Sequence, residues 1–304
     1  MPKRKIQTGL RTVDLFAGCG GLSLGLERAG YEIVFAADSW DAAVDCYRRN
    51  LKHRVEQLDL SEPQNLISAL GGIEFDVVVG GPPCQDFSTA GTRIESGRAD
   101  LTETFAEIVC RLGPRAFVME NVPRTQRSAA LSRARKRLLA RGYQIVEHVL
   151  DASHFGVPQA RKRLFVVGLL DRDPHGFSEK IEELKTPEPM TVRDYFGARL
   201  ETDFYYRHPR NYSRRAVYSI DEPSPTVRGV NRPIPPGYPG HPGDAAPIGP
   251  TVRPLTFMER AEIQTFPREM VLTGTKSDLE LLIGNAVPVN LARAVGLALR
   301  AALD

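Results

Sequence analysis

The chain has 304 residues, 42% of them hydrophobic, which is enough for one large domain and a smaller partner. Its 40 lysines and arginines against 37 aspartates and glutamates give a net charge of only +3, which is compatible with a nucleic-acid partner without requiring one. The N-terminus has no apolar signal core and no run approaches eighteen apolar residues, so we expect a soluble, cytoplasmic protein without membrane contact.

In the first half of the chain, short apolar runs alternate with segments of helical period. The apolar runs fit buried parallel strands and cover residues 12–16, 32–37, 75–79 and 116–119. Helices are predicted over residues 22–29, 42–50, 104–112 and 128–141. This alternation predicts an α/β fold with a doubly wound, Rossmann-like sheet.

The composition changes between residues 171 and 254, which contain fourteen of the chain's twenty-three prolines and few periodic segments. Loops are therefore expected to dominate this part. Helical period resumes at residues 257–265 and 289–303. We expect a large domain of residues 1–186 and 284–304, interrupted by a smaller, loop-rich domain and hinge of residues 187–283.

A glycine-rich turn, DLFAGCGGLSLGLERAG, follows the first predicted strand at residues 14–30. Gly18, Gly20 and Gly21 allow a sharp turn and a close approach to a ligand. The spacing is not the G-x-G-x-x-G of dinucleotide enzymes and no Walker lysine follows, which disfavours pyrophosphate and ATP as ligands. A tight turn without a ligand is the alternative.

Two acidic residues follow later strands of the same sheet. Asp38 ends the second predicted strand, where a carboxylate can accept hydrogen bonds from ribose hydroxyls. Asp59 could receive an adenine amino group, and Phe16 or Trp40 could stack on the ring. Together with the glycines, these residues predict a nucleoside pocket.

A cysteine follows two prolines in GGPPCQDFS, residues 80–88. Prolines cannot continue a helix or a central strand, so we expect the backbone to leave the sheet before Cys84 and to hold its shape there. The four cysteines (Cys19, Cys46, Cys84, Cys110) have none of the close spacing of zinc ligands, so no metal site is predicted and the thiols are expected to be reduced.

Two further segments carry polar residues at predicted strand ends. In MENV, Glu120 ends an apolar strand, and apolar neighbours would raise the pKa of its carboxyl group. In QARKR, Gln159, Arg161 and Arg163 alternate, so an extended backbone would place the three side chains on one face. A capped strand end and a salt-bridged surface ladder, respectively, are the alternatives.

The motifs DLFAGCGG, GGPPCQDFS, MENV, QARKR and GNAVPVNLA occur in this order. In this order and spacing they resemble the motifs of the DNA (cytosine-5) methyltransferases, from residue 11 to residue 303 apart from the proline-rich insert. The resemblance implies a methyltransferase sheet binding S-adenosylmethionine and a target-recognition domain. It further implies that Cys84 is the nucleophile, that Glu120 engages the base, and that Arg161 and Arg163 flank it.

The resemblance also implies a cofactor pocket formed by Phe16, Gly18, Gly20, Gly21, Asp38, Ser39, Trp40, Asp59, Leu60, Pro82, Leu101, Asn285 and Val287. The ribose-binding acid of the family is usually glutamate followed by a bulky residue, whereas here Asp38 precedes Ser39 and then Trp40. Which ring covers the adenine therefore stays open.

Duplex DNA is the implied substrate, with the target cytosine rotated out of the helix because its faces are covered inside the stack. The residues expected to contact DNA are Gln85, Ser88, Gln159, Arg207, Arg210, Arg214, Arg215, Arg228 and Arg232. We expect a monomer located at the nucleoid through DNA, serving a restriction-modification system without direct contact with the endonuclease. A tRNA cytosine-5 methyltransferase and a catalytically inactive DNA-binding relative are the alternatives.

Overall fold

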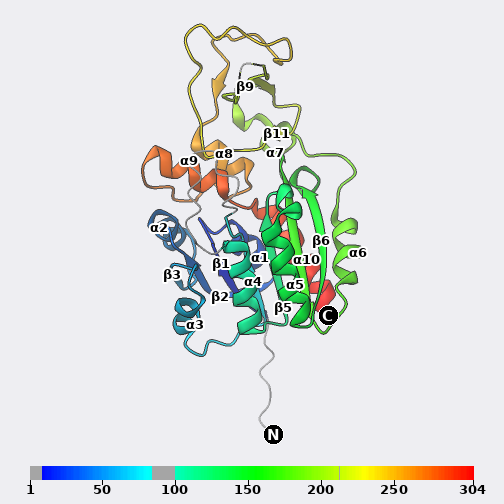
Figure 1. Ribbon diagram of the computed structural model, residues 1–304. Coiled ribbons are helices and arrows are strands. Elements are labelled where there is room, and N and C mark those ends of the chain that lie inside the picture. The colour runs from blue at the N-terminus through cyan, green and yellow to red at the C-terminus, as the bar shows by residue number, and fades with distance from the viewer. Residues whose placement is uncertain (1–8, 84–99, 212) are drawn as a thin grey trace. The chain divides into compact units, whose positions relative to one another are not determined.

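The computed structural model describes residues 9–83, 100–211 and 213–304, and the chain divides into two compact units (Figure 1). The first unit comprises the chain up to Leu150, then Lys162–Leu184 and Ala292–Asp304. The second comprises Asp151–Arg161 and Lys185–Leu291, and so extends on both sides of the expected 187–283 segment.

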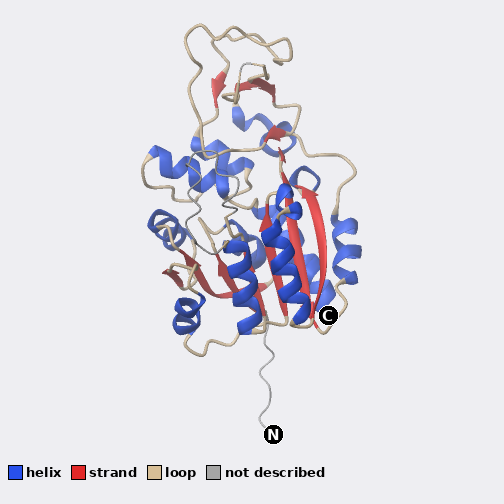
Figure 2. Cartoon of the chain, in the orientation of Figure 1, coloured by secondary structure: helices blue, strands red, loops and turns tan. Residues whose placement is uncertain are grey.

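The first unit is built on a seven-stranded sheet with the order β3-β2-β1-β4-β5-β8-β6 (Figure 2). Its strands are β1 Leu10–Leu15, β2 Tyr31–Asp38, β3 Val55–Gln57, β4 Val77–Gly80, β5 Ala116–Asn121, β6 Tyr143–Asp151 and β8 Lys162–Leu170. Strands β3, β2, β1, β4 and β5 are parallel, and β8 pairs antiparallel with β5. The four predicted strands are thus confirmed as β1, β2, β4 and β5, within a sheet that is mixed.

Helices pack on both faces of this sheet. Successive side chains of β1 point to opposite faces, so each face carries side chains that a helix can cover. Val13 and Leu15 join a core with Phe105 and Leu131, whereas Asp14 points to the other face and meets α1. The helices of this unit are α1 Gly21–Arg28, α2 Asp41–Asn50, α3 Pro63–Leu70, α4 Leu101–Leu112, α5 Ala129–Ala140, η2 Pro123–Arg127, α6 His175–Leu184 and most of α10 Val289–Leu303. The four helices predicted in the first half are confirmed as α1, α2, α4 and α5.

The second unit has little regular structure. A three-stranded sheet joins β10 Val217–Ser219, β9 Phe204–Tyr206 and β12 Arg253–Pro254, and the short pair β7 Gln159–Ala160 and β11 Ser224–Pro225 is parallel. Its helices are η3 Ala152–His154, α7 Val192–Phe196, η4 Gly197–Leu200, α8 Phe257–Ile263 and α9 Lys276–Asn285. The expectation that loops dominate residues 171–254 holds except at α6 and the short elements α7, η4 and β9–β12.

In the described part of the chain, one stretch, Lys276–Leu303, has the length and apolar composition of a membrane span, with a mean hydropathy of 1.4. It consists of α9 and α10, and 72% of its most apolar window is buried inside the protein.

Candidate active site

The glycine-rich turn follows β1 at the carboxyl end of the sheet. Three of its residues have a positive φ, at 56° for Phe16, 56° for Gly18 and 86° for Gly20. A Cβ at Gly20 would collide with Leu51, whereas a Cβ at Gly18 would meet no described atom within 4 Å. Gly20 is therefore required by packing, and Gly18 lies against open space that a ligand can approach.

Asp38 is held against this turn from the end of β2. Its Oδ2 accepts a hydrogen bond from the Gly18 N–H at 2.8 Å, and its Oδ1 accepts one from the Trp40 N–H at 2.9 Å. Burial raises the pKa of this carboxyl group. Because each carboxylate oxygen can accept more than one hydrogen bond, Asp38 can shape the turn and still bind a ribose hydroxyl.

The remaining predicted pocket residues of the first unit have different surroundings. Ser39 and Asp59 are exposed, and the Asp59 carboxylate accepts a hydrogen bond from the Ser61 N–H at 2.9 Å. Leu60 is only 2% exposed and belongs to the core against which Phe16 packs, so its part in the pocket stays a prediction. Leu101 begins α4 and is half-buried.

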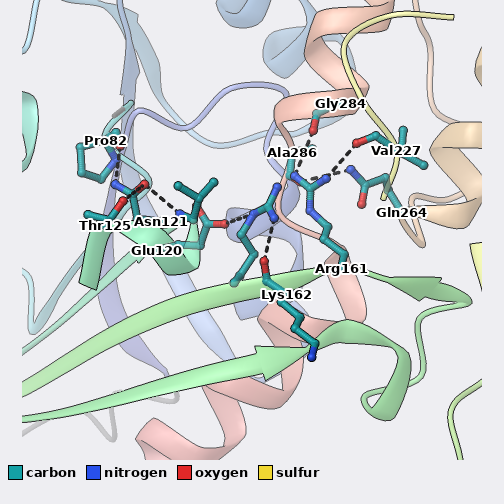
Figure 3. Close-up of polar contacts among 12 residues, drawn as sticks. Pro82, Glu120, Asn121, Thr125, Arg161, Lys162, Val227, Gln264, Gly284 and Ala286 are labelled. Atoms are coloured by element: carbon teal, nitrogen blue, oxygen red, sulfur yellow. Dashed lines mark hydrogen bonds and ion pairs between the residues drawn. The ribbon is translucent and has the colours of Figure 1, made fainter. Parts of the chain in front are cut away.

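The segment that leads to the predicted nucleophile lies against the MENV segment. Strands β1, β4 and β5 are adjacent, with Leu15 opposite Gly80 and Gly80 opposite Met119. The Asn121 side chain donates to the Pro82 carbonyl at 2.9 Å (Figure 3). A Cβ at Gly81 would lie 3.2 Å from Glu120 Oε2. The chain is thus fixed beside Glu120 up to this point, while Cys84, Gln85 and Ser88 fall outside the described residues.

Glu120 forms an ion pair with Arg163, the second arginine of QARKR, which lies on β8. The Arg163 Nε lies 2.9 Å from Glu120 Oε1, and the two side chains are only 14% and 10% exposed (Figure 3). The expected surroundings of Glu120 were apolar. The antiparallel pairing of β5 with β8 instead brings a guanidinium to the carboxylate.

Arg161 and Gln159 belong to the second unit and are buried, at 1% and 0% exposure. The Arg161 guanidinium donates to the carbonyls of Val227 at 3.1 Å, Gly284 at 2.9 Å and Ala286 at 3.0 Å (Figure 3). Gln159 donates to Gln264 Oε1 and accepts from the Val227 N–H, both at 2.8 Å. These contacts cross-link loops of the unit, and a contact of either side chain with DNA stays a prediction.

The six arginines predicted to contact DNA fall into two groups. Arg207 donates to the Thr226 carbonyl at 2.7 Å, Arg228 donates to the His208 carbonyl, and Arg215 forms a two-point ion pair with Glu222. The other three are exposed: Arg210, Arg214 and Arg232. Only the second group is directly available to a groove in the structure as described.

Two predicted cofactor residues, Asn285 and Val287, lie in the second unit, the first exposed at the end of α9 and the second buried. Their part in the pocket stays a prediction.

Sequence reasoning missed Asp14, which precedes the glycine-rich turn and is fully buried. Its Oδ2 accepts a hydrogen bond from Ser23 at 2.6 Å, and Ser23 in turn accepts one from the Tyr47 hydroxyl at 2.7 Å. Burial raises the pKa of Asp14 to about 7. The signal in the sequence was an acidic residue inside an apolar run that precedes a ligand-binding turn.

The chain was compared with known proteins. Residues 10–301 match the family model described as C-5 cytosine-specific DNA methylase. The Type II methyltransferase M.HindV of Haemophilus influenzae is 49% identical over 292 residues, covering 95% of this chain and 96% of that protein. The Type II methyltransferase M.HgiDI of Herpetosiphon aurantiacus is also 49% identical, covering 97% and 96%.

Solved structures show the same fold at low identity. A putative DNA modification methyltransferase encoded in an Escherichia coli prophage superposes with a TM-score of 0.74 at 22% identity, covering 97% of this chain and 99% of that one. The Dnmt2 methyltransferase of Schizosaccharomyces pombe gives a TM-score of 0.66 at 20% identity, covering 96% and 98%. With its ordered motifs and sheet, and with a family match over nearly its whole length, the chain belongs to the C-5 cytosine-specific DNA methylases and is a DNA cytosine methyltransferase.

Proposed function

We propose that this enzyme transfers a methyl group from S-adenosylmethionine to carbon 5 of a cytosine within a short sequence of duplex DNA. The observation that carries the proposal is that three neighbouring strands end side by side and that each is followed by, or ends in, one of the motifs. Leu15, Gly80 and Met119 are paired across β1, β4 and β5, so the glycine-rich turn, the GGPP segment and Glu120 emerge at one sheet edge. In an open α/β sheet this edge is where ligands bind.

Cys84 is proposed as the nucleophile. Carbon 5 of cytosine is a weak nucleophile, and addition of a thiolate to carbon 6 makes carbon 5 nucleophilic. After methylation, a base removes the carbon 5 proton and the carbon 6 to sulfur bond breaks, which restores the aromatic ring and the thiolate. The fixed position of Pro82 against Asn121 supports this role, because it limits the freedom of the chain two residues before the sulfur.

Glu120 is proposed to hold the other side of the base at ring nitrogen 3. A proton held there neutralises the charge that thiolate addition would leave on the ring. Arg163 is proposed to orient the Glu120 carboxyl group through their 2.9 Å ion pair.

The methyl donor fits the turn after β1. The open space beside Gly18 and the spare acceptor capacity of Asp38 are what a nucleoside-bearing cofactor requires. When bound, S-adenosylmethionine supplies an electrophilic methyl group on its sulfonium. The residues proposed to hold it are Phe16, Gly18, Gly20, Gly21, Asp38, Ser39, Trp40, Asp59, Leu60, Pro82 and Leu101, with Asn285 and Val287.

We further propose that the enzyme modifies DNA for a Type II restriction-modification system, acting as a cytoplasmic monomer on a flipped cytosine. The two relatives that are 49% identical over almost the whole chain are both named Type II methyltransferases, which supports this assignment. A tRNA methyltransferase is the alternative activity. Competition between tRNA and mixed-sequence duplex DNA for methyl transfer would separate the two substrates.

The test is methylation of mixed-sequence duplex DNA with labelled S-adenosylmethionine, followed by bisulfite sequencing to locate the modified cytosine. A duplex with 5-fluorocytosine at that position should trap the enzyme covalently, because the fluorine cannot leave as a proton does. The trapped complex should be absent with Cys84→Ser. A covalent complex that persists in this variant would falsify the assignment of Cys84.

A further inference from the structure

Two cysteines of the first unit are hydrogen-bonded to each other, one in the glycine-rich turn and one on α2. Cys19 lies between Gly18 and Gly20, and Cys46 lies in the middle of α2. Both are free thiols and both are buried, at 2% and 0% exposure. The Cys19 thiol donates to the Cys46 sulfur. The cofactor role proposed for the turn uses neither side chain, so the pair needs an explanation of its own.

The two thiols differ in their surroundings. The Asn50 amide donates to the Cys46 sulfur at 3.8 Å and to the Cys46 carbonyl at 2.8 Å, which fixes the amide beside the sulfur. The hydrogen bonds from Cys19 and Asn50 lower the pKa of the Cys46 thiol. Donation to Cys46 and burial raise the pKa of Cys19. The pair therefore combines a sulfur that readily becomes a thiolate with a thiol held next to it, which is what a two-step oxidation requires.

The turn and α2 pack closely around this pair. Ala17 of the turn shares a small core with Val44 and Tyr47 of α2. A Cβ at Gly20 would lie 3.1 Å from the Tyr47 ring. The sulfurs of a disulfide are closer together than those of a hydrogen bond, so forming the bond must move one segment toward the other. Because α2 is held by its own backbone hydrogen bonds, we expect the turn to move.

Burial restricts the oxidants that can reach the pair. At 2% exposure, Cys19 is out of reach of a bulky disulfide such as oxidised glutathione. The turn is open at the neighbouring Gly18, where a Cβ would meet no described atom within 4 Å. Hydrogen peroxide is close to water in size, so a peroxide is the class of oxidant that fits this site.

We propose that Cys19 and Cys46 form a disulfide when the enzyme meets hydrogen peroxide, and that this bond weakens binding of S-adenosylmethionine by displacing the glycine-rich turn. The Cys46 thiolate attacks one peroxide oxygen, the oxygen to oxygen bond breaks, and the leaving hydroxide takes up the proton that Cys46 released. The Cys19 sulfur then attacks the sulfur of the Cys46 sulfenic acid, and the hydroxyl group leaves with the Cys19 proton as a second water. The two thiols give two electrons to one peroxide, and a dithiol reductant reverses the reaction.

The effect on the cofactor rests on the proposed function, whereas formation of the disulfide does not. Asp38 accepts a hydrogen bond from the Gly18 N–H at 2.8 Å, next to Cys19, so a displaced turn also disturbs the acid proposed to bind ribose. Oxidation and cofactor binding must then oppose each other by linkage. A tenfold difference in affinity corresponds to about 30 mV in the reduction potential of the pair, with the bound cofactor favouring the dithiol.

The first test maps the disulfide by mass spectrometry. The four cysteines lie on four different tryptic peptides, with Cys19 on residues 12–28 and Cys46 on residues 29–48. After treatment with peroxide and alkylation without reduction, these two peptides should be cross-linked, and dithiothreitol should release them. Cys46→Ser should abolish the cross-link, whereas the matched control Cys110→Ser should keep it. Oxidised glutathione under the same conditions should leave the pair reduced.

The second test measures the affinity for S-adenosylmethionine by calorimetry, in a full-length Cys84→Ser, Cys110→Ser protein whose only cysteines are Cys19 and Cys46. Peroxide should lower this affinity about tenfold or more, and dithiothreitol should restore it. Adding Cys46→Ser should make the affinity insensitive to peroxide, because serine keeps a hydrogen-bonding group but cannot form the bond. Saturating cofactor should raise the reduction potential of the pair by the amount that linkage requires.

Several outcomes would overturn the proposal. Oxidation of Cys84 or Cys110 with the two peptides left unlinked would exclude the disulfide, as would a product that stops at a Cys46 sulfinic acid. A mixed disulfide of either cysteine with glutathione would contradict the restriction to small oxidants. A cross-link with unchanged affinity, in a protein shown to be folded by circular dichroism and thermal unfolding, would refute the effect on the turn. If the reduced protein binds no S-adenosylmethionine, the proposed function falls, and the peptide map still decides whether the disulfide forms.

Discussion

The two units position their charged groups by different means. At the sheet edge of the first unit, strand register places Glu120 and Arg163, and the carboxylate and the guanidinium neutralise each other. In the second unit, loop carbonyls hold Arg161, Arg207 and Arg228, whose charges are not matched by carboxylates in these contacts. The first unit thus places its charged pair by strand register, whereas the second places its guanidinium groups by loop conformation.

The largest effect is expected from a substitution of Glu120, at the sheet edge of the first unit. Glu120→Gln keeps the size of the side chain but removes its acid-base capacity, so single-turnover methylation should fall about 10²–10⁴-fold. The matched control is Glu103→Gln, which breaks the surface ion pair between Glu103 of α4 and Arg133 of α5 and should leave the rate near that of the wild type.

Glu120→Gln also leaves Arg163 buried without its carboxylate, so the unfolding free energy must be measured alongside the rate. A folded Glu120→Gln protein with a wild-type rate would remove Glu120 from the chemistry.

The second prediction concerns pH and the buried Asp14. Its pKa is about 7 in the folded state, well above the value of about 4 expected when unfolded, so the folded state binds more protons between these values. The contribution of Asp14 to stability is therefore greatest below about pH 4 and is lost as pH rises through 7. The full loss is up to about 4 kcal/mol.

In Asp14→Asn the stability should change less between pH 5 and pH 8 than in the wild type, as measured by urea unfolding. The slope with pH is the informative quantity, because the new amide also alters the hydrogen bond with Ser23. Ser23→Ala is the control that disturbs this hydrogen bond and keeps the titrating group. Parallel pH profiles for Asp14→Asn and the wild type would contradict the prediction.

The sequence predicted part of the first unit, including the strand that carries Glu120, but not the environment of Glu120 or of Asp14. Apolar runs predicted β1, β2, β4 and β5, since a strand buried on both faces needs a continuous apolar segment. The carboxyl ends of parallel strands then brought Glu120 and the GGPP segment to one edge. The helices α3 and α6 were not predicted, and the pairing of Glu120 with Arg163 depends on an antiparallel register that residue spacing does not encode.

The second unit was less predictable for a physical reason. Its arginines were recognised as a group, but their separation into carbonyl-bound, carboxylate-bound and exposed side chains depends on loop conformations. The ion pair of Arg260 with the buried Glu280 was not predicted either, because the helical period of residues 257–265 predicts a helix but not the partner of one of its side chains.

The third prediction compares one glycine in each unit. A Cβ at Gly80 would lie 2.5 Å from the Leu15 carbonyl and 3.0 Å from the Phe105 ring, and one at Gly284 would collide with the backbone of Gly229. Each substitution by alanine should cost about 1–3 kcal/mol through overpacking. Gly249→Ala is the control, because its Cβ would meet no described atom within 4 Å.

The two variants should differ in function. Gly80→Ala should impair binding of S-adenosylmethionine by calorimetry, since β4 borders the glycine-rich turn after β1, whereas Gly284→Ala should mainly weaken binding of DNA. If both variants lost both activities equally, the contrast between the units would not hold.

The smallest expected effect concerns the start of α8, which carries Arg260. The Thr256 side chain accepts from the Glu259 N–H at 3.1 Å, and the Glu259 carboxylate accepts from the Thr256 N–H at 2.7 Å, so the helix begins with a capping box. Thr256→Ala should lower the unfolding free energy by about 1 kcal/mol, and Thr256→Ser should restore most of it. Urea unfolding measures this loss, and an unfolding free energy of Thr256→Ala equal to that of the wild type would contradict the capping role of Thr256.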